Sequence, residues 1–326
     1  MNINADELEE QYKLKDMEKE LKPVDNIYTT TVEYKIGNIY VRLKSQFDLA
    51  AMSLYTPFIV DTISVIPNIT IEIKQISVFC IKNMYKKLDE ELDNDCTYTW
   101  IMKDNGYYMI FSKRFQKLID AEWEDIWILY CNDKFSECVL HIPYAEKDSN
   151  ILYEMSVRPW LQRLFVAFSC KLDFVIFHGA LVDINGTGIA FLGNSGVGKS
   201  TMCKIIESEK ATVIADDRFI LDLTGNLVCA GTPWNIKNQH YCRNLCSKLK
   251  KVYVLSHGNN QINEIGDSYN DMMKALFPAM LFPPFMSPDE VLVNKARYMT
   301  HIRKSCKIYS FAFKPDDSAI PYITAI

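Results

Sequence analysis

Short runs in which apolar and polar residues alternate dominate residues 26–150 and predict β-strands. These runs are rich in β-branched and aromatic side chains, and turn-forming residues separate them. Asn105-Gly106, between two such runs, is typical of a tight hairpin turn. Helical stretches are expected near 46–54 and 114–121. The predicted strands are 28–34, 38–43, 69–73, 98–102, 107–111 and 127–131. No chemical motif lies in this β-rich α+β region, so its role stays open.

The pattern of apolar positions changes near residue 151. Five large apolar residues recur there at helical spacing and predict a helix within 151–172: Trp160, Leu161, Leu164, Phe165 and Phe168. Strands are predicted at 174–177, 180–184, 189–192, 212–215, 219–223 and 227–230, with a helix at 199–207. This alternation predicts an α/β domain over 151–326, following the β-rich region at 26–150.

Residues 1–25 contain twelve charged residues and predict a charged helix or a loose tail that ends near Pro23. Over the whole chain of 326 residues, 36 Lys and Arg stand against 41 Asp and Glu, for a net charge of −5. This balance argues against a nucleic-acid partner. No apolar run approaches the roughly 18 residues of a membrane span, and the acidic start predicts no secretory signal.

Ten cysteines are scattered along the chain without the spacing of a disulfide framework. They predict buried thiols in a reducing cytoplasm. One cluster, His240, Cys242 and Cys246, brings three soft ligands close in sequence, but a fourth ligand at zinc-site spacing is missing. Simple packing is the preferred interpretation, and metal binding stays open.

The sequence Gly-Asn-Ser-Gly-Val-Gly-Lys-Ser at 193–200 fits the P-loop pattern G-x-x-x-x-G-K-[ST]. Its glycines allow successive backbone N–H groups to turn toward an anion. Lys199 would reach the β- and γ-phosphates, and Ser200 would offer a hydroxyl to Mg²⁺. A predicted strand enters the loop and a predicted helix leaves it, which is the context that the motif requires. The predicted nucleotide contacts are Gly193, Asn194, Ser195, Gly196, Val197, Gly198, Lys199, Ser200 and Thr201.

Two adjacent carboxylates, Asp216 and Asp217, follow the next predicted strand. Beside a triphosphate they require a compensating charge, which Mg²⁺ would supply. One carboxylate would hold the metal, and the other would take a proton from an attacking hydroxyl. His178 ends the strand at 174–177, and if that strand neighbours the P-loop strand its imidazole would face the γ-phosphate. Arg218 is the basic residue nearest to the acidic pair.

Residues 177–200 read FHGALVDINGTGIAFLGNSGVGKS, and Ile-Ala-Asp-Asp follows at 214–217. Both the residues and their spacing closely resemble the catalytic domain of the HPr kinase/phosphorylase family. That family joins a His-Gly pair, a Val-Asp-Ile-x-Gly-x-Gly turn, a P-loop and an Ala-Asp-Asp strand end. The C-terminal part is more similar to HPr-kinase-related proteins found beside peptide natural-product clusters, including kinases that phosphorylate a serine of a precursor peptide.

The resemblance implies a mixed-sheet P-loop domain of the phosphoenolpyruvate-carboxykinase type. It implies that Asp216 helps to hold Mg²⁺ and that Asp217 is the general base, although the two roles could be exchanged. It also implies that His178 lies near the transferring phosphoryl group. Thr201 stands where HPr kinases usually carry Glu, and a downstream Arg-Gly-x-Gly signature is missing, so the reverse reaction and HPr as substrate stay open.

Three other functions share parts of this pattern. A transporter-type ATPase is disfavoured because its Leu-Ser-Gly-Gly signature is missing and Asp216 follows the loop too early. A regulatory protein that binds ATP without transferring phosphate would not need the second carboxylate, Asp217. A small-molecule kinase with the same machinery stays open. The favoured prediction is an ATP- and Mg²⁺-dependent kinase that phosphorylates a serine hydroxyl of a peptide or small protein, with its oligomeric state open.

Overall fold

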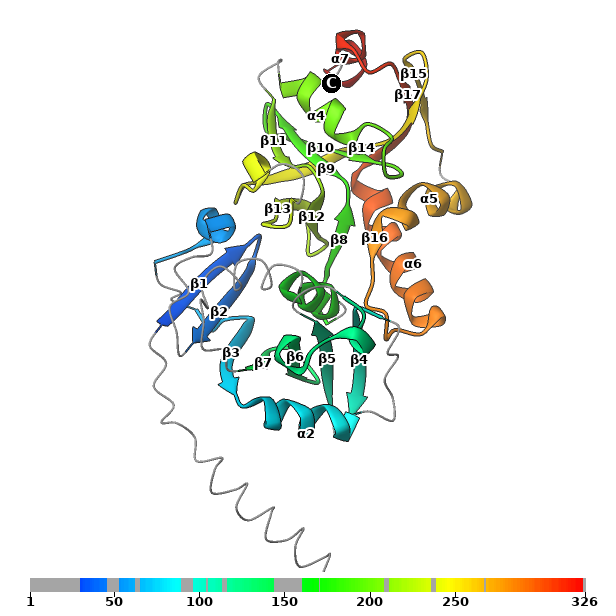
Figure 1. Cartoon of the computed structure of the whole chain (residues 1–326). Helices are drawn as coiled ribbons and strands as arrows, with labels where there is room; N and C mark the ends of the chain where they lie inside the picture. Colours follow the sequence, from blue (N-terminus) through cyan, green and yellow to red (C-terminus); the bar gives the residue numbers. More distant parts are fainter. Residues whose placement is uncertain are drawn as a thin grey trace, which may run out of the picture.

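The structure is a computed structural model that describes residues 30–45, 53–61, 65–88, 96–103, 105–112, 116–143, 160–169, 171–207, 211–235, 239–266 and 268–324. The predicted tail at 1–25 and the predicted boundary at 150 lie outside the described residues. Two β-sheets follow one another along the chain, and helices pack around them (Figure 1). Within the described chain, no helix is long and apolar enough to cross a membrane.

The first sheet forms from the region that the sequence predicted to be β-rich, at the lower end of Figure 1. Most neighbouring strands pair antiparallel, but β3 pairs parallel with both β2 and β7. Buried positions alternate along β2 and β3, as expected for strands with one face in a core. In spatial order the strands are β1 (Thr30–Ile36), β2 (Ile39–Ser45), β3 (Ile69–Ile76), β7 (Glu137–Pro143), β6 (Ile126–Asn132), β5 (Gly106–Ser112) and β4 (Tyr98–Lys103).

The helices of this region differ from those that the sequence predicted. Helix α2 (Val78–Leu88) was not predicted, and it buries Ile81, Tyr85 and Leu88 against one face of the sheet. The helix expected near 114–121 is wrong over its described part, where only the short 3₁₀ turn η3 (Leu118–Asp120) forms, followed by η4 (Trp123–Asp125). Most of the helix predicted at 46–54 lies outside the described residues, and η1 (Ser53–Phe58) begins near its end.

The second sheet forms from residues after 171 and is mixed. Strand β10 runs parallel to β14, and β14 runs parallel to β17, whereas the other described pairs are antiparallel. The main path in spatial order is β11 (Thr212–Ala215), β9 (Ala180–Ile184), β10 (Thr187–Leu192), β14 (Cys246–His257), β13 (Val228–Gly231), β12 (Arg218–Asp222), β8 (Phe174–His178) and β16 (Met280–Leu281). Strand β17 (Lys307–Phe313) pairs with β14 and with β15 (Gln261–Glu264).

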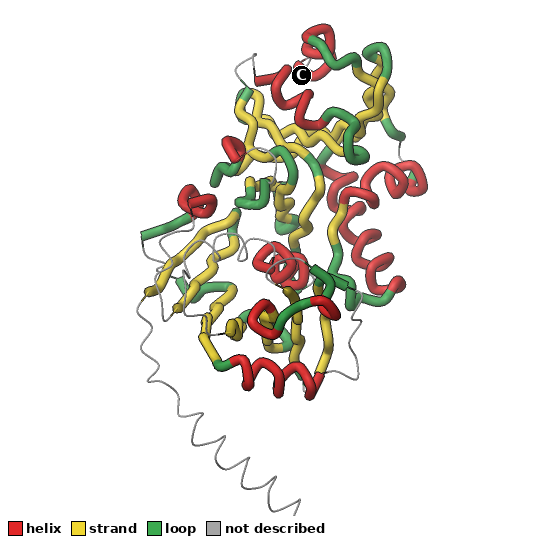
Figure 2. Tube along the Cα trace, viewed as in Figure 1, coloured by secondary structure: helices red, strands yellow, loops and turns green. Residues whose placement is uncertain are grey.

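Helices flank this second sheet (Figure 2). Helix α4 follows β10, and α5 and α6 lie along one side of the domain. Helix α6 begins at a capping box, in which the Glu290 backbone N–H donates to Ser287 Oγ and the Ser287 backbone N–H donates to the Glu290 carboxylate. The described helices and turns are α4 (Lys199–Glu207), η5 (Gln239–Tyr241), α5 (Tyr269–Leu276), η6 (Phe277–Ala279), α6 (Pro288–Ser305), η7 (Asp317–Ala319) and α7 (Ile320–Thr324).

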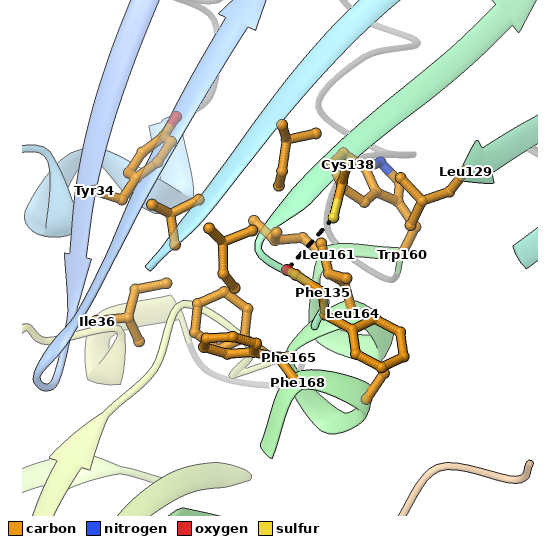
Figure 3. Close-up of a cluster of buried hydrophobic side chains, with 14 of the residues drawn as sticks. Tyr34, Ile36, Leu129, Phe135, Cys138, Trp160, Leu161, Leu164, Phe165 and Phe168 are labelled. Atoms are coloured by element: carbon orange, nitrogen blue, oxygen red, sulfur yellow. Dashed lines mark hydrogen bonds between the residues drawn. The ribbon is translucent and has the colours of Figure 1, made fainter. Parts of the chain in front are cut away.

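One hydrophobic cluster joins the two sheets. Residues 160–169 are helical, as predicted, and their apolar side chains face the first sheet (Figure 3). Trp160 and Phe165 are fully buried in one cluster with first-sheet residues such as Tyr34 and Leu129, and Trp160 lies near Leu129 and Cys138 (Figure 3). The same cluster includes Ile220 of β12 and Trp234, which follows β13. The two sheets therefore share part of their core.

Candidate active site

The P-loop lies where β10 ends and α4 begins, in the upper part of Figure 1. Gly198 has a φ of +99°, a backbone conformation that L side chains rarely adopt. A Cβ atom at this position would also lie 2.7 Å from Cζ of Phe313. Glycine is therefore required at 198 by both the backbone and the packing. The backbone N–H groups of the first turn of α4 point back toward the loop, where they can bind an anion.

Lys199 is almost fully buried at the start of α4. Its Nζ donates hydrogen bonds to the carbonyl oxygens of Gly193 at 2.8 Å and Asn194 at 3.1 Å. The ammonium group is thus held over the loop, at the place where phosphate oxygens would contact it. Val197 instead packs at the edge of the hydrophobic cluster beneath the loop.

The loop and the acidic pair share one cavity of about 210 Å³. This volume is below the roughly 300–1,000 Å³ of sites that enclose a drug-sized ligand, so it suits phosphate groups better than a whole nucleotide. Of the predicted site residues, Gly193, Asn194 and Val197 do not line it. Its lining residues are His178, Ser195, Gly196, Gly198, Lys199, Ser200, Thr201, Asp216, Asp217 and Asn235.

Asp216 is buried at the end of β11, with 6% of its surface exposed. Burial raises the pKa of this carboxyl group, and a hydrogen bond with Ser200 and the charge of Lys199 partly counter that effect. Its Oδ1 atom is buried and has no hydrogen-bond partner among the described residues. A desolvated carboxylate oxygen beside a serine hydroxyl is a donor set that fits Mg²⁺.

Asn235 holds the backbone of the acidic pair, a role that no sequence motif predicts. Its side-chain Oδ1 accepts hydrogen bonds from the backbone N–H groups of Asp216 and Asp217, both at 3.0 Å. Its Nδ2 donates to the carbonyl oxygens of Tyr241 at 2.6 Å and Thr232 at 3.3 Å. Asn235 is fully buried, so all these bonds form away from water. A buried amide with both ends bonded fixes the turn that carries the two carboxylates.

Asp217 lies beside His178 and Arg218. The His178 Nδ1 atom is 3.3 Å from Asp217 Oδ1. The Arg218 guanidinium donates to the same Oδ1 at 2.8 Å and to the Asp217 carbonyl oxygen at 2.9 Å, and it also contacts His178 Nδ1. Because β12 pairs antiparallel with β8, Arg218 and His178 are direct cross-strand partners. Burial lowers the pKa of Arg218 to about 10, so it stays charged at neutral pH.

Other sequence candidates lie outside this cavity. Trp234 is fully buried and packs edge to face on Phe165 at 5.0 Å, so it belongs to the core. His240 and Cys246 are exposed whereas Cys242 is buried. Within the described part of the chain, no group of three or more His, Cys, Asp and Glu side chains could hold a metal ion.

Comparison with known proteins agrees with the motif at the site. The chain is 38% identical over 149 residues to the HPr kinase/phosphorylase of Mycoplasma mycoides subsp. mycoides SC, a match that covers 42% of this chain and 45% of the relative. It is 36% identical over 52 residues to the HPr kinase/phosphorylase of Prosthecochloris aestuarii, covering 16% and 15%. No family model matches the chain. The chain thus has a family relationship to the HPr kinases, and it spans less than half the length of the curated relatives it matches.

Proposed function

We propose that this protein is a kinase that transfers the γ-phosphoryl group of ATP to a hydroxyl, most specifically a serine hydroxyl of a peptide or small protein in the cytoplasm. The observation that carries the proposal is the single cavity shared by the P-loop, the Asp216-Asp217 pair and His178. The relationship to HPr kinase/phosphorylases supports it. The phosphoenolpyruvate-carboxykinase type of fold is part of the same proposal, and the mixed second sheet is compatible with it.

In this proposal the loop binds the polyphosphate. Backbone N–H groups at the start of α4 and the Lys199 ammonium would surround the phosphate oxygens. Ser200 and Asp216 would hold Mg²⁺, because both residues line the cavity, their side chains interact, and Asp216 keeps an oxygen, Oδ1, without a hydrogen-bond partner among the described residues. The metal, when bound, would neutralise charge that develops on the phosphate oxygens.

Asp217 would accept the proton of the acceptor hydroxyl. The hydroxyl oxygen then forms a bond to the γ-phosphorus, the bond from that phosphorus to the β–γ bridging oxygen breaks, and ADP leaves. The Arg218 guanidinium holds the Asp217 carboxylate by a 2.8 Å contact. His178, 3.3 Å from the same carboxylate, faces the same cavity and would lie near the transferring group.

The proposal is tested by transfer of a radiolabelled γ-phosphate from ATP in the presence of Mg²⁺. The acceptors are peptides encoded by neighbouring genes, HPr and fractionated cell extract, and Lys199→Ala is the control. The expected result is a labelled serine with the unmodified protein and no labelled serine with Lys199→Ala. Tight ATP binding with no labelled acceptor in any fraction would instead support a regulatory nucleotide-binding protein. Label confined to a small molecule would support the small-molecule kinase.

A further inference from the structure

A second cavity, of about 850 Å³, is strongly basic. It lies at the N-terminal ends of β14 and β17 and at the C-terminal end of α6, near the hairpin between β12 and β13 (Figure 1). No Asp or Glu occurs among its described lining residues. We call it the basic groove, and its cations are Lys248, Lys250, Lys251, Arg303, Lys304 and Lys307.

The basic groove is separate from the candidate active site. Strands β10 and β14 run parallel, with Thr187 beside Lys248 and Leu192 beside Val254. Thr187 lines the groove, whereas the P-loop begins directly after Leu192. Leu192 lies five residue steps after Thr187, which is about 17 Å at the usual rise of a β-strand. The two sites therefore lie at opposite ends of the same strands.

The positive charge of the groove is not an average property of the surface. The whole chain carries a net charge of −5, yet six cations line this one cavity. Lys251 and Lys307 are direct partners in the parallel pairing of β14 with β17. Like charges opposite one another on adjacent strands repel, and burial together with the charge of Lys307 lowers the pKa of Lys251. A bound anion would relieve this repulsion.

The spacing of the cations fits an extended chain better than a single compact anion. Lys248 and Lys250 are both exposed, and the buried Leu249 stands between them. In a regular strand such residues are about 7 Å apart, the spacing of alternate side chains of an extended peptide, and the register of β14 against β10 shifts at Lys250. Lys307, on the adjacent strand, continues the positive charge across the sheet.

We propose that the basic groove binds an acidic segment of the phosphate acceptor, a peptide in extended conformation with carboxylates on alternate residues. The inference rests on the proposed function, because it concerns the acceptor of that reaction. A link of at least five or six extended residues would span the distance from the groove to the P-loop. The groove would hold the acceptor by charge while a hydroxyl elsewhere on it enters the cavity at Asp217.

Fluorescently labelled hexaglutamate is the probe, with hexaglutamine as the uncharged control and inorganic tripolyphosphate as the compact anion. Binding is measured by anisotropy at low and high salt, with and without ATP. Lys248→Glu/Lys250→Glu is the groove variant. Lys86→Glu/Lys134→Glu reverses two exposed charges on the first sheet and its helix, and it serves as the matched control. Circular dichroism and ATP affinity are measured for both variants, to test that each keeps the fold and the P-loop.

The expected result is one hexaglutamate site that ATP does not compete for and that weakens as salt rises. The groove variant should lower its affinity at least about tenfold, and the control variant less than about twofold. Equal loss in both variants, or competition by ATP, would overturn the proposal. If tripolyphosphate binds and the groove variant weakens that binding, while hexaglutamate does not bind, the groove is not a site for an acidic peptide. Because these readouts need no phosphate transfer, failure of the kinase proposal would be seen separately.

Discussion

The two sheets place their buried polar side chains differently. In the second sheet, Lys199, Asp216 and Asn235 gather around one cavity at one end of the strands. In the region of the first sheet, the buried polar side chains lie at two places: Ser45 ends β2, and Ser112 and Asp125 lie where β5 ends and β6 begins, with β3 and β7 between β2 and β6. Scattered polar groups of this kind can each be satisfied locally, without forming a site.

The difference explains why only one region carries recognisable chemistry. Groups brought together in a desolvated cavity interact strongly, and an orphaned carboxylate oxygen there is stable only if a ligand or metal compensates it. Asp216 has such an oxygen, and burying it without a partner lowers the stability of the folded protein at the site. The first sheet instead supplies packing, because its apolar face shares a core with the helix at 160–169 and with Trp234.

The largest effect is expected for Asp217→Asn. This change keeps the shape of the side chain but removes the proton acceptor, so transfer should fall by roughly 10²–10⁴-fold. Nucleotide affinity should change by less than about threefold, since the loop and Asp216 are untouched. Single-turnover transfer and equilibrium ATP binding measure the two quantities. Full activity in the variant would remove Asp217 from the role of base.

Trp234→Ala tests whether the two sheets form one cooperative unit. Trp234 is fully buried in the shared cluster, so the free energy of unfolding should fall by about 3–5 kcal/mol in a single transition. Denaturant unfolding followed by fluorescence and circular dichroism measures it. Phe79→Ala, at a side chain that is 56% exposed, is the control and should cost less than about 0.5 kcal/mol. Two separate unfolding transitions, only one of which moves to lower denaturant concentration in Trp234→Ala, would show that the two sheets unfold independently.

Asn235→Ala should damage both the site and the fold around it. It leaves the backbone N–H groups of Asp216 and Asp217 without their acceptor, which should cost about 1–3 kcal/mol of stability. The transfer rate should fall more than ATP affinity, because the carboxylates lose their position while the loop does not. Asn83→Ala on α2 is the comparison in the first sheet and should leave transfer unchanged. An Asn235→Ala protein with a normal transfer rate would contradict the positioning role.

The smallest effect concerns acid stability and the first sheet. Burial, together with the charge of Lys74, lowers the pKa of His141 on β7 to about 4. The unfolded chain takes up this proton near pH 6.5 and the folded chain only near pH 4, so His141 supports stability above pH 6.5 and loses that support as the pH falls toward 4. Between pH 6.5 and pH 4, the free energy of unfolding should fall by roughly 1–3 kcal/mol less in His141→Gln than in the unmodified protein. If the free energy of unfolding depends on pH in the same way in both proteins, His141 does not make this contribution.

Local pattern predicted much of the fold. The alternating runs of the first sheet became strands, and the predicted helix at 199–207 and strand at 212–215 match α4 and β11 to the residue. Strand β7 (Glu137–Pro143) was not predicted, although its burial alternates along the strand as it does in β2 and β3. Strand order was also beyond prediction, since β3 pairs parallel with β7 across more than sixty residues of chain.

The site was predictable where a motif fixed it. Lys199, Ser200, Asp216, Asp217 and His178 line one cavity. The expected neighbourhood of the His178 strand and the P-loop strand is wrong, because β8 pairs with β12 and β16, and His178 reaches the cavity beside Arg218 instead. Asn235 could not be found in this way, because its role comes from the return of the chain after β13 toward the acidic pair. A buried asparagine next to a core tryptophan has no sequence signature. The basic groove likewise needs β14, β17 and α6 to come together before its charges form a pattern.

The central claim is that the end of the second sheet binds a nucleotide polyphosphate with a metal. ATP affinity measured by calorimetry at increasing Mg²⁺ concentration tests it most directly, in the unmodified protein, Asp216→Asn and Lys199→Ala. The account predicts that Mg²⁺ strengthens ATP binding, that Asp216→Asn weakens this dependence, and that Lys199→Ala lowers affinity at every Mg²⁺ concentration. ATP affinity that is unchanged by both substitutions and by Mg²⁺ would contradict it.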